Sequence, residues 1–230
     1  MVQMEHINVI SNLVALARDQ NVELEARFGS LTNGRFVPGV TRKKMDSIMT
    51  FLQKSPYIRF DKDWNEVQDF FFAHQNLPHR TRVEYSTDTM KLCSHTILKQ
   101  PLGHVNLVND ADPESDEQIR ISVKREKPVI PPIVCNAEYV RIKQTKRFTC
   151  MKERSPNVFA FDFAMTWSGR TKTDAESKQQ TCEPVYEIEC ELICRDYLEN
   201  HDDLYVAESI LLKMIDLTED ASKVRYRLQA

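Results

Sequence analysis

Residues 186–193 alternate strictly between acidic and apolar side chains. The sequence YEIECELI places Glu187, Glu189 and Glu191 at every second position, with apolar residues between them. Because successive side chains of a β-strand point to opposite faces, the three carboxylates share one face and the apolar residues share the other. The segment is therefore predicted to be a strand with a charged face and a core face. Taken alone, it also fits an edge strand with a solvated face, which is common in antiparallel sheets.

The same alternation recurs in five further segments. They are 22–29, 79–86, 118–126, 139–147 and 159–166. Glutamates concentrate on the first and last of the six segments, whereas Arg and Lys concentrate on segments between them. A single solvated sheet would mix short polar residues on its outer face instead. Opposite charges face one another when a sheet closes, so we predict a mostly β (α+β) fold. Its centre is a closed antiparallel barrel with a polar lumen, flanked by a few helices.

Helical patterns lie on both sides of the predicted barrel, which spans about residues 21–195. Apolar residues at helical spacing predict helices at 4–19, near 41–55 and at about 202–217. No internal repeat or low-complexity linker divides the chain, so we predict one domain over residues 1–230. With 41% hydrophobic and 28% charged residues the chain can bury a core, and a net charge of −3 gives no general attraction to nucleic acid.

Several shorter segments carry local expectations. Residues 56–74 are predicted to form a hairpin with Trp64 at its tip, and the three phenylalanines at 70–72 to pack outside the barrel. The polar segments 109–117, 128–134 and 169–183 are predicted to be loops. The six histidines show no metal-ligand spacing and are expected to be surface or packing residues.

Cysteine usage and the N-terminal sequence indicate an intracellular protein. The six cysteines form no CxxC pair, which favours free thiols over zinc ligands or disulfides. The first residues lack the apolar run of a signal peptide, and no apolar stretch reaches the roughly 18 residues of a membrane helix. We therefore expect no membrane partner.

The predicted lumen combines glutamates with arginines and lysines. Carboxylates are ligands that Mg²⁺ and Mn²⁺ prefer, and these ions commonly share substrate phosphates. Arg and Lys suit phosphoryl oxygens, Arg as a bidentate fork and Lys as a point charge. Buried charges that neutralise one another only in part are costly without a ligand. The pattern indicates a metal-dependent phosphohydrolase acting on an oligophosphate.

Four segments carry a resemblance to a known family: ELEARFG, RISVKREKP, RIKQTKRF and YEIECEL. In order and spacing they resemble the motifs of the triphosphate tunnel metalloenzymes. Within that family they are most similar to the RNA 5′-triphosphatases of fungal, protozoan and DNA-virus mRNA capping. The resemblance covers about residues 20–195. It implies an eight-stranded antiparallel tunnel that removes the γ-phosphate from triphosphate-ended (pre-)mRNA, leaving a diphosphate end in the first step of capping.

The resemblance also implies roles for individual residues. The implied ligands of Mg²⁺ or Mn²⁺ are Glu23, Glu25 and Glu191. The implied catalytic residues are Glu189, which would act on the attacking water, Glu187, which would hold neighbouring basic groups, and the phosphate-contacting pair Arg141 and Lys143. The remaining implied phosphate-binding residues are Arg82, Lys99, Arg120, Lys124 and Arg147. Supporting residues are Glu126, Asp162 and Arg27; Ala164 stands where the family often has Thr, with Thr166 nearby.

Other functions share this pattern. A tunnel enzyme of the same fold could act on inorganic tripolyphosphate or on nucleoside triphosphates, and a non-catalytic barrel could bind polyanions. Activity on triphosphate-ended RNA, compared with small substrates, separates these alternatives. The resemblance implies 5′-triphosphate RNA and nucleoside triphosphates as partners, together with a capping guanylyltransferase in cis or in trans. It implies a nuclear location for a cellular protein, and the virion or the viral factory in the cytoplasm for a viral one.

Overall fold

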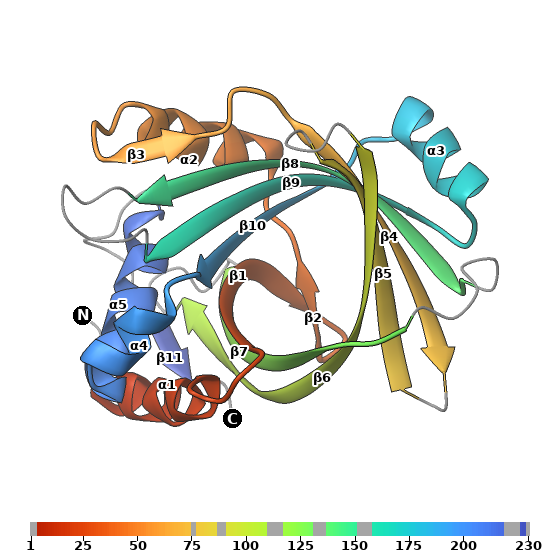
Figure 1. Ribbon diagram of the computed structural model, residues 1–230. Coiled ribbons are helices and arrows are strands. Elements are labelled where there is room, and N and C mark those ends of the chain that lie inside the picture. The colour runs from red at the N-terminus through yellow and green to blue at the C-terminus, as the bar shows by residue number, and fades with distance from the viewer. Residues whose placement is uncertain are drawn as a thin grey trace.

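Eight antiparallel strands close into a barrel in the computed structural model, which describes residues 4–74, 77–86, 91–109, 117–130, 137–150, 158–218 and 226–228. The strands follow one another around the ring in the order β10-β9-β8-β4-β5-β6-β7-β1, and pairing of β1 with β10 closes it (Figure 1). Their bounds are β1 (Val22–Thr32), β4 (Asn65–His74), β5 (Leu77–Ser86), β6 (Lys91–Asn109), β7 (Glu117–Pro128), β8 (Tyr139–Cys150), β9 (Phe159–Gly169) and β10 (Val185–Leu192). The predicted closed eight-stranded barrel is confirmed.

The strand register turns the charged faces inward. Across the closing pair, Glu25 lies opposite Glu191 and Arg27 lies opposite Glu189. On the other side of β1, Arg27 is opposite Arg120. Because residues two apart in a strand share a face, the whole charged set of each strand lines the lumen. The residues between them form the apolar outer surface of the barrel.

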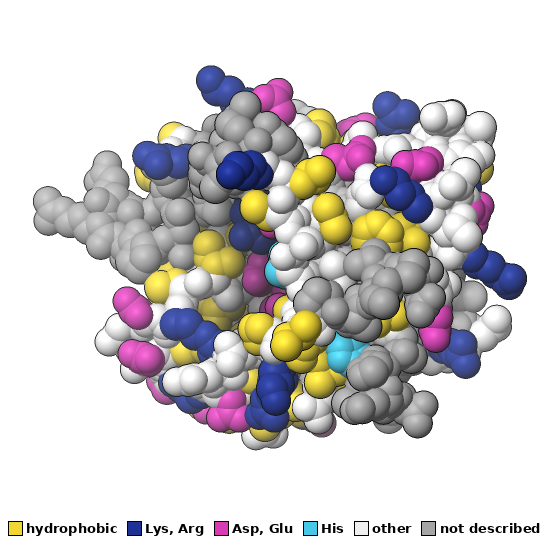
Figure 2. All heavy atoms as spheres, turned by 45° about the vertical axis from the view of Figure 1, so that its right-hand side comes forward, with side chains coloured by type: hydrophobic (Ala, Val, Ile, Leu, Met, Phe, Trp, Pro, Cys, Tyr) yellow, Lys and Arg dark blue, Asp and Glu magenta, His cyan; other side chains and the backbone are white. Residues whose placement is uncertain are grey.

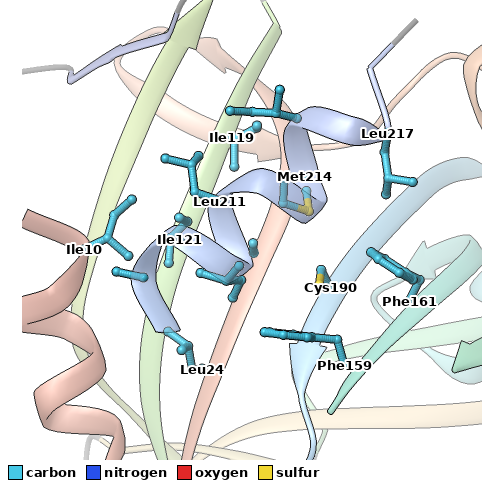
Figure 3. Packing of buried hydrophobic residues seen from close by; sticks show 14 of the residues in the cluster. Ile10, Leu24, Ile119, Ile121, Phe159, Phe161, Cys190, Leu211, Met214 and Leu217 are labelled. Atoms are coloured by element: carbon cyan, nitrogen blue, oxygen red, sulfur yellow. The ribbon is translucent and has the colours of Figure 1, made fainter. Parts of the chain in front are cut away.

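Three helices cover one side of this outer surface. They are α1 (Met4–Ala17), α4 (Arg195–Asn200) and α5 (Asp203–Asp216), which gather beside β1, β7 and β10 in Figure 1. Figure 3 shows apolar side chains of α1 and α5 converging with outward residues of the barrel strands. Labelled there are Ile10, Leu24, Ile119, Ile121, Phe159, Phe161, Cys190, Leu211, Met214 and Leu217. The hydrophobic effect, which favours removal of this apolar surface from water, is the main force that holds the helices to the barrel.

Two more helices have side-chain caps at their N-termini. In α2 (Arg42–Gln53) the Thr41 hydroxyl accepts from the backbone N–H of Lys44, and in α3 (Lys172–Thr181) Thr171 accepts from Asp174. Such caps satisfy a backbone N–H that lacks a helical partner. The α2 helix was expected, but α3 corrects the prediction of a loop at 169–183. Its polar sequence has little hydrophobic periodicity, so the Thr-x-x-Asp cap was the only local signal.

The short strands also depart from expectation. Residues 56–74 do not form a hairpin: β3 (Ile58–Phe60) and β4 both pair with β8, one after the other along the same edge. Trp64 is partly buried against the core instead of marking a hairpin tip. Because Phe71 has the parity of Asp69, it lies on the lumen side, where the Arg141 guanidinium is 5.1 Å from its ring centroid.

Two predicted strands form one strand in the structure, and several short elements were not predicted. β6 is one strand with an irregularity between Pro101 and Gly103, where two separate strands were expected, because a proline interrupts the ladder without ending it. A tight turn at Asn33 and Gly34, with φ of 52° and 73°, leads into β2 (Arg35–Pro38). The helix α4 and the strands β2 and β11 (Tyr226–Leu228) had no sequence-based prediction. Most of the predicted loops 109–117 and 128–134 lies outside the described residues, and so does Cys135.

Cys150, Cys182, Cys190 and Cys194 are thiols without a disulfide. No helix in the described part of the chain is long and apolar enough to span a membrane. On the face in Figure 2, basic and acidic side chains are intermixed, and a recess near its centre holds side chains of both signs.

Candidate active site

The β1 glutamates enter the lumen next to basic side chains of three strands. Lys99 Nζ of β6 lies 2.9 Å from Glu23 Oε2. Arg27, two residues along β1, places Nη2 2.8 Å from Glu25 Oε2, and Lys124 of β7 donates to the other oxygen of Glu25. Although burial opposes ionisation of Glu25, Arg27 and Lys124 outweigh it and lower the pKa of Glu25 to about 2. The predicted pairing of β1 carboxylates with cations of other strands is therefore present.

The β10 glutamates are divided between two basic residues of β8. Lys143 Nζ lies 3.0 Å from Glu187 Oε2 and 3.5 Å from Glu189 Oε1. Arg147 Nη2 lies 2.9 Å from Glu191 Oε2. Strand β9 separates β8 from β10 in the sheet, so these contacts cross the lumen face of β9. The structure thus brings together three residues of the predicted site, Glu187, Glu189 and Lys143.

Asp69 of β4 is a lumen residue that the sequence-based site omitted. Its side chain is fully buried and accepts two hydrogen bonds from Arg82, of 2.8 and 3.1 Å, and one of 2.9 Å from Arg141. Burial opposes its ionisation, but the hydrogen bonds from Arg82 and the charge of Arg141 lower the pKa of Asp69 far below its ordinary value. Asp69 therefore holds two predicted phosphate-binding arginines in fixed positions. The available signal was its spacing of two residues from Val67 and from Phe71, which puts the three side chains on one face of β4.

Two further sets of contacts complete the lumen. Glu126 Oε1 lies 2.7 Å from Lys99 Nζ and 3.7 Å from an Arg80 nitrogen, so Glu126 contacts two basic residues of the lumen. Asp162 of β9 lies 2.5 Å from Arg147 Nη2 and holds that guanidinium beside β10. Arg80 was also absent from the predicted site.

The pKa values of Glu189 and Glu191 shift in opposite directions, although both residues belong to one strand and one face. Burial disfavours the charged form of Glu189, but Arg27 and Lys143 outweigh burial and lower its pKa well below the ordinary value. Burial, followed by repulsion from Glu23, raises the pKa of Glu191 to about 7. Burial also raises the pKa of Glu23 despite the adjacent lysine. Glu189 is thus held in its charged form, whereas Glu23 and Glu191 bind a proton more readily than an ordinary glutamate does.

The donor chemistry of Glu23, Glu25 and Glu191 fits a hard divalent cation, which takes carboxylate oxygens as ligands. Within the described residues, no three acidic, His or Cys side chains converge closely enough to hold a metal ion. Lys99 and Lys124 contact Glu23 and Glu25 and supply the positive charge there. Burial, together with neighbouring carboxylates, raises the pKa of Glu23 and of Glu191, so a cation between β1 and β10 would favour their charged forms.

Three guanidinium groups in the lumen have a donor without an acceptor. The Nε–H groups of Arg27, Arg80 and Arg141 are buried, and no described residue accepts a hydrogen bond from them. A buried donor left without a partner costs free energy. Since each side chain also contacts a carboxylate of the lumen, the unused donors lie among the predicted site residues. They suit an anionic ligand that brings many acceptor oxygens.

Two cavities bear on where such a ligand would lie. One, of about 210 Å³, belongs to the lumen and extends from Glu25, Arg27 and Lys124 to Phe36 of β2. A larger one, of about 710 Å³, lies outside the barrel between α4, α5 and the ends of β8 and β9, and none of the predicted site residues lines it. We place the site in the lumen because the paired charges and the unused donors are there.

Comparisons with known proteins agree with this description of the fold. No protein-family model matches the sequence, and no curated protein matches it significantly. Solved structures of RNA triphosphatases share its architecture, so the closed barrel with a charged lumen is the triphosphate tunnel fold that the sequence predicted. At the identities found, below one residue in five, this likeness shows a common fold.

Two of these structures show the extent of the likeness. The S. pombe Pct1 RNA triphosphatase has 18% sequence identity and a TM-score of 0.66, and the alignment covers 94% of this chain and 93% of Pct1. Pct1 has also been solved in complex with the Spt5 CTD. The mimivirus capping enzyme triphosphatase has 14% identity and a TM-score of 0.56, with 94% of this chain and 98% of the viral chain covered. The shared architecture thus spans nearly the whole of each chain.

Proposed function

We propose that this protein is a metal-dependent RNA 5′-triphosphatase that removes the γ-phosphate of triphosphate-ended RNA and leaves a diphosphate end. The observation that carries the proposal is the set of buried, unused guanidinium donors of Arg27, Arg80 and Arg141 beside the glutamates of β1 and β10. A triphosphate supplies acceptor oxygens for these donors. The glutamates supply ligands for the divalent cation that accompanies it.

The basic residues bind and orient the triphosphate. Arg82 and Arg141, fixed by Asp69, present guanidinium groups on one side of the lumen, and Lys143 adds an ammonium group beside Glu187. Phosphoryl transfer needs little covalent help, so positioning and charge neutralisation supply most of the catalysis. Removal of one preorganised donor from such a site commonly lowers the rate by roughly 10²–10³-fold.

Glu189 orients the attacking water. Its low pKa keeps it ionised, so a carboxylate oxygen accepts a hydrogen bond from the water and directs the water oxygen towards the γ-phosphorus. Arg27 and Lys143 fix the position of this carboxylate. A carboxylate of low pKa is a weak base, which favours orientation over full proton removal in the ground state.

Glu23, Glu25 and Glu191 would hold Mg²⁺ or Mn²⁺. When bound, the ion would polarise the terminal phosphoryl group and offset its charge. Lys99 and Lys124 contact two of these carboxylates and would give up part of those contacts to it. Arg147, held by Asp162, would keep Glu191 in place.

Three further features follow from the proposal. Nucleoside triphosphates are expected substrates, because the site residues are so far proposed to contact only the phosphates, the metal ion and the attacking water. A capping guanylyltransferase, in cis or in trans, is the expected partner, since it acts on the diphosphate end. The expected location is that of capping: the nucleus for a cellular protein, or the virion or viral factory for a viral one.

Labelled RNA tests the proposal directly. RNA carrying ³²P at the γ- or the α-position of its 5′-triphosphate is incubated with the protein and Mg²⁺ or Mn²⁺. We expect label to be released as phosphate from the γ-position only, and chelation of the metal to stop the release. Lys143→Ala should slow release strongly, whereas Gln144→Ala, its neighbour on the outer face of β8, should not. Release of α-label, or no release from either RNA, would refute the proposal.

A further inference from the structure

The lumen cavity has a charged end and an aromatic end. Glu25 and Lys124 line it together with Phe36, His104 and Arg120. Along β1 the order Glu23, Glu25, Arg27, Gly29 leads from the carboxylates towards β2, because Gly29 pairs with Pro38 of that strand. A ligand that places its phosphates among the charged residues therefore extends towards Phe36.

We propose that Phe36, Arg120 and His104 form a subsite for the first nucleoside of the substrate, stacking the base attached to the triphosphate. The proposal rests on the proposed function, because it needs the triphosphate to occupy the lumen. The subsite distinguishes nucleotide-ended substrates from inorganic tripolyphosphate. Since every base offers a π-face, stacking gives little preference among bases.

Phe36 is held on the lumen face of the β1–β2 hairpin by a glycine. A Cβ atom at Gly29 would lie 2.5 Å from Cζ of Phe36 and 2.4 Å from the carbonyl oxygen of Val37. No side chain fits there, so the absence of one at position 29 lets the ring lie against the strand. The tight Asn33–Gly34 turn sets the register that places Phe36 opposite Leu31. The ring is thus a fixed part of the cavity wall.

Arg120 lies over this ring. Its guanidinium carbon is 4.3 Å from the ring centroid, and its Nε donates a 2.8 Å hydrogen bond to Asn106 Oδ1. The ring and the amide together hold the guanidinium in one orientation. Arginine planes support stacked bases as aromatic rings do.

Arg120 also differs from the other lumen cations. Arg27, Lys99 and Lys143 each contact carboxylates, whereas no described acidic residue pairs with Arg120, and burial followed by the charge of Arg27 lowers its pKa. The described partners of Arg120 are the Asn106 amide and the Phe36 ring, neither of which neutralises its charge. Its guanidinium group is therefore suited to bind a ligand. His104, an exposed residue opposite Ser122, extends the same wall with a second flat ring.

Binding measurements on the intact chain test the subsite separately from catalysis. Affinities for ATP, a short triphosphate-ended RNA and inorganic tripolyphosphate are measured by titration calorimetry, for the wild type, Phe36→Ala, Arg120→Lys and the control Val37→Ala. Val37 is 46% exposed on the other face of β2. Alanine substitution of a stacking residue costs roughly 1–3 kcal/mol per base, which is about 5- to 150-fold in affinity.

We expect Phe36→Ala to lower the affinity ratio of ATP to tripolyphosphate, and of RNA to tripolyphosphate, by about tenfold. Arg120→Lys should lower both ratios, because lysine keeps the positive charge but lacks the planar guanidinium group on which a base can stack. Val37→Ala should change neither. Unchanged ratios in folded Phe36→Ala and Arg120→Lys would overturn the subsite. A different result would refute the RNA triphosphatase proposal: no release of γ-phosphate from RNA by the wild-type protein.

Discussion

Substituting Asp69 by Asn should destabilise the protein more than any exposed acidic substitution. The carboxylate is fully buried and accepts three hydrogen bonds, two from Arg82 and one from Arg141. Asparagine keeps the size but removes the charge and one acceptor oxygen, leaving two guanidinium groups without their counter-ion. Removing one partner of a buried ion pair costs about 3–5 kcal/mol.

The cost should fall near the low end of that range. The side chains of Arg82 and Arg141 are 25% and 18% exposed, so water can solvate part of each guanidinium in the variant. For a chain of this size each kcal/mol shifts Tm by about 2–4 °C, so about 3 kcal/mol predicts a fall of roughly 6–12 °C. Differential scanning calorimetry at pH 7 measures the fall. Asp63→Asn, in an exposed position, is the control.

The pH dependence of the effect provides a second check. The folded-state pKa of Asp69 lies far below the value of about 3.9 expected for the unfolded chain. Its contribution to stability is therefore complete above the unfolded pKa and is lost as the pH falls through the folded pKa. The Tm difference between wild type and Asp69→Asn should stay constant from pH 5 to 8 and narrow in acid. An Asp69→Asn protein as stable as Asp63→Asn at pH 7 would refute the assignment of Asp69 as the buried anchor of the two arginines.

Other substitutions separate the roles within β10. Glu191→Gln should abolish turnover and weaken Mn²⁺ binding measured by calorimetry, because the ion loses one of few charged oxygens; full Mn²⁺ affinity would exclude Glu191 as a ligand. Glu189→Gln should lower kcat by roughly 10²-fold or more and keep most of the metal and triphosphate affinity. A loss of metal binding equal to that of Glu191→Gln would contradict this division. Cys190→Ala should lower stability by about 1 kcal/mol or more and leave the rate of the folded protein unchanged, because Cys190 is buried outside the barrel. Burial raises the pKa of the Cys190 thiol, so iodoacetamide should modify it only after unfolding, as peptide mass analysis would show.

The barrel and the content of its lumen could be predicted because they depend on a local rule. Residues two apart in a strand share a face, so Glu187, Glu189 and Glu191 had to face the same side wherever the strand was placed. The same rule placed Arg141 and Lys143 in the lumen. Helices with clear apolar stripes, such as α1 and α5, followed from their periodicity. The polar helix α3 has no such stripe, which is why it was expected to be a loop.

The tertiary structure decided which groups meet. In the sequence, Asp69 is one acid beside three phenylalanines, and only the neighbouring strands β5 and β8 make it the anchor of Arg82 and Arg141. The pairing of both β3 and β4 with β8 likewise depends on a partner distant in the chain. The subsite around Phe36 exists because the β1–β2 hairpin lies beside β7.

Glu189 and Glu191 show most clearly which properties depend on the sequence alone and which depend on the tertiary structure. In the sequence they are the same residue type, two positions apart on one face, and nothing local distinguishes them. In the folded chain both are partly buried, but Arg27 and Lys143 lower the pKa of Glu189, whereas repulsion from Glu23 adds to burial and raises the pKa of Glu191 to about 7. Electrostatic energies depend on distances between groups brought together by folding. The sequence by itself therefore determined that these carboxylates share the lumen, and the closure of β1 against β10 determined how each one ionises.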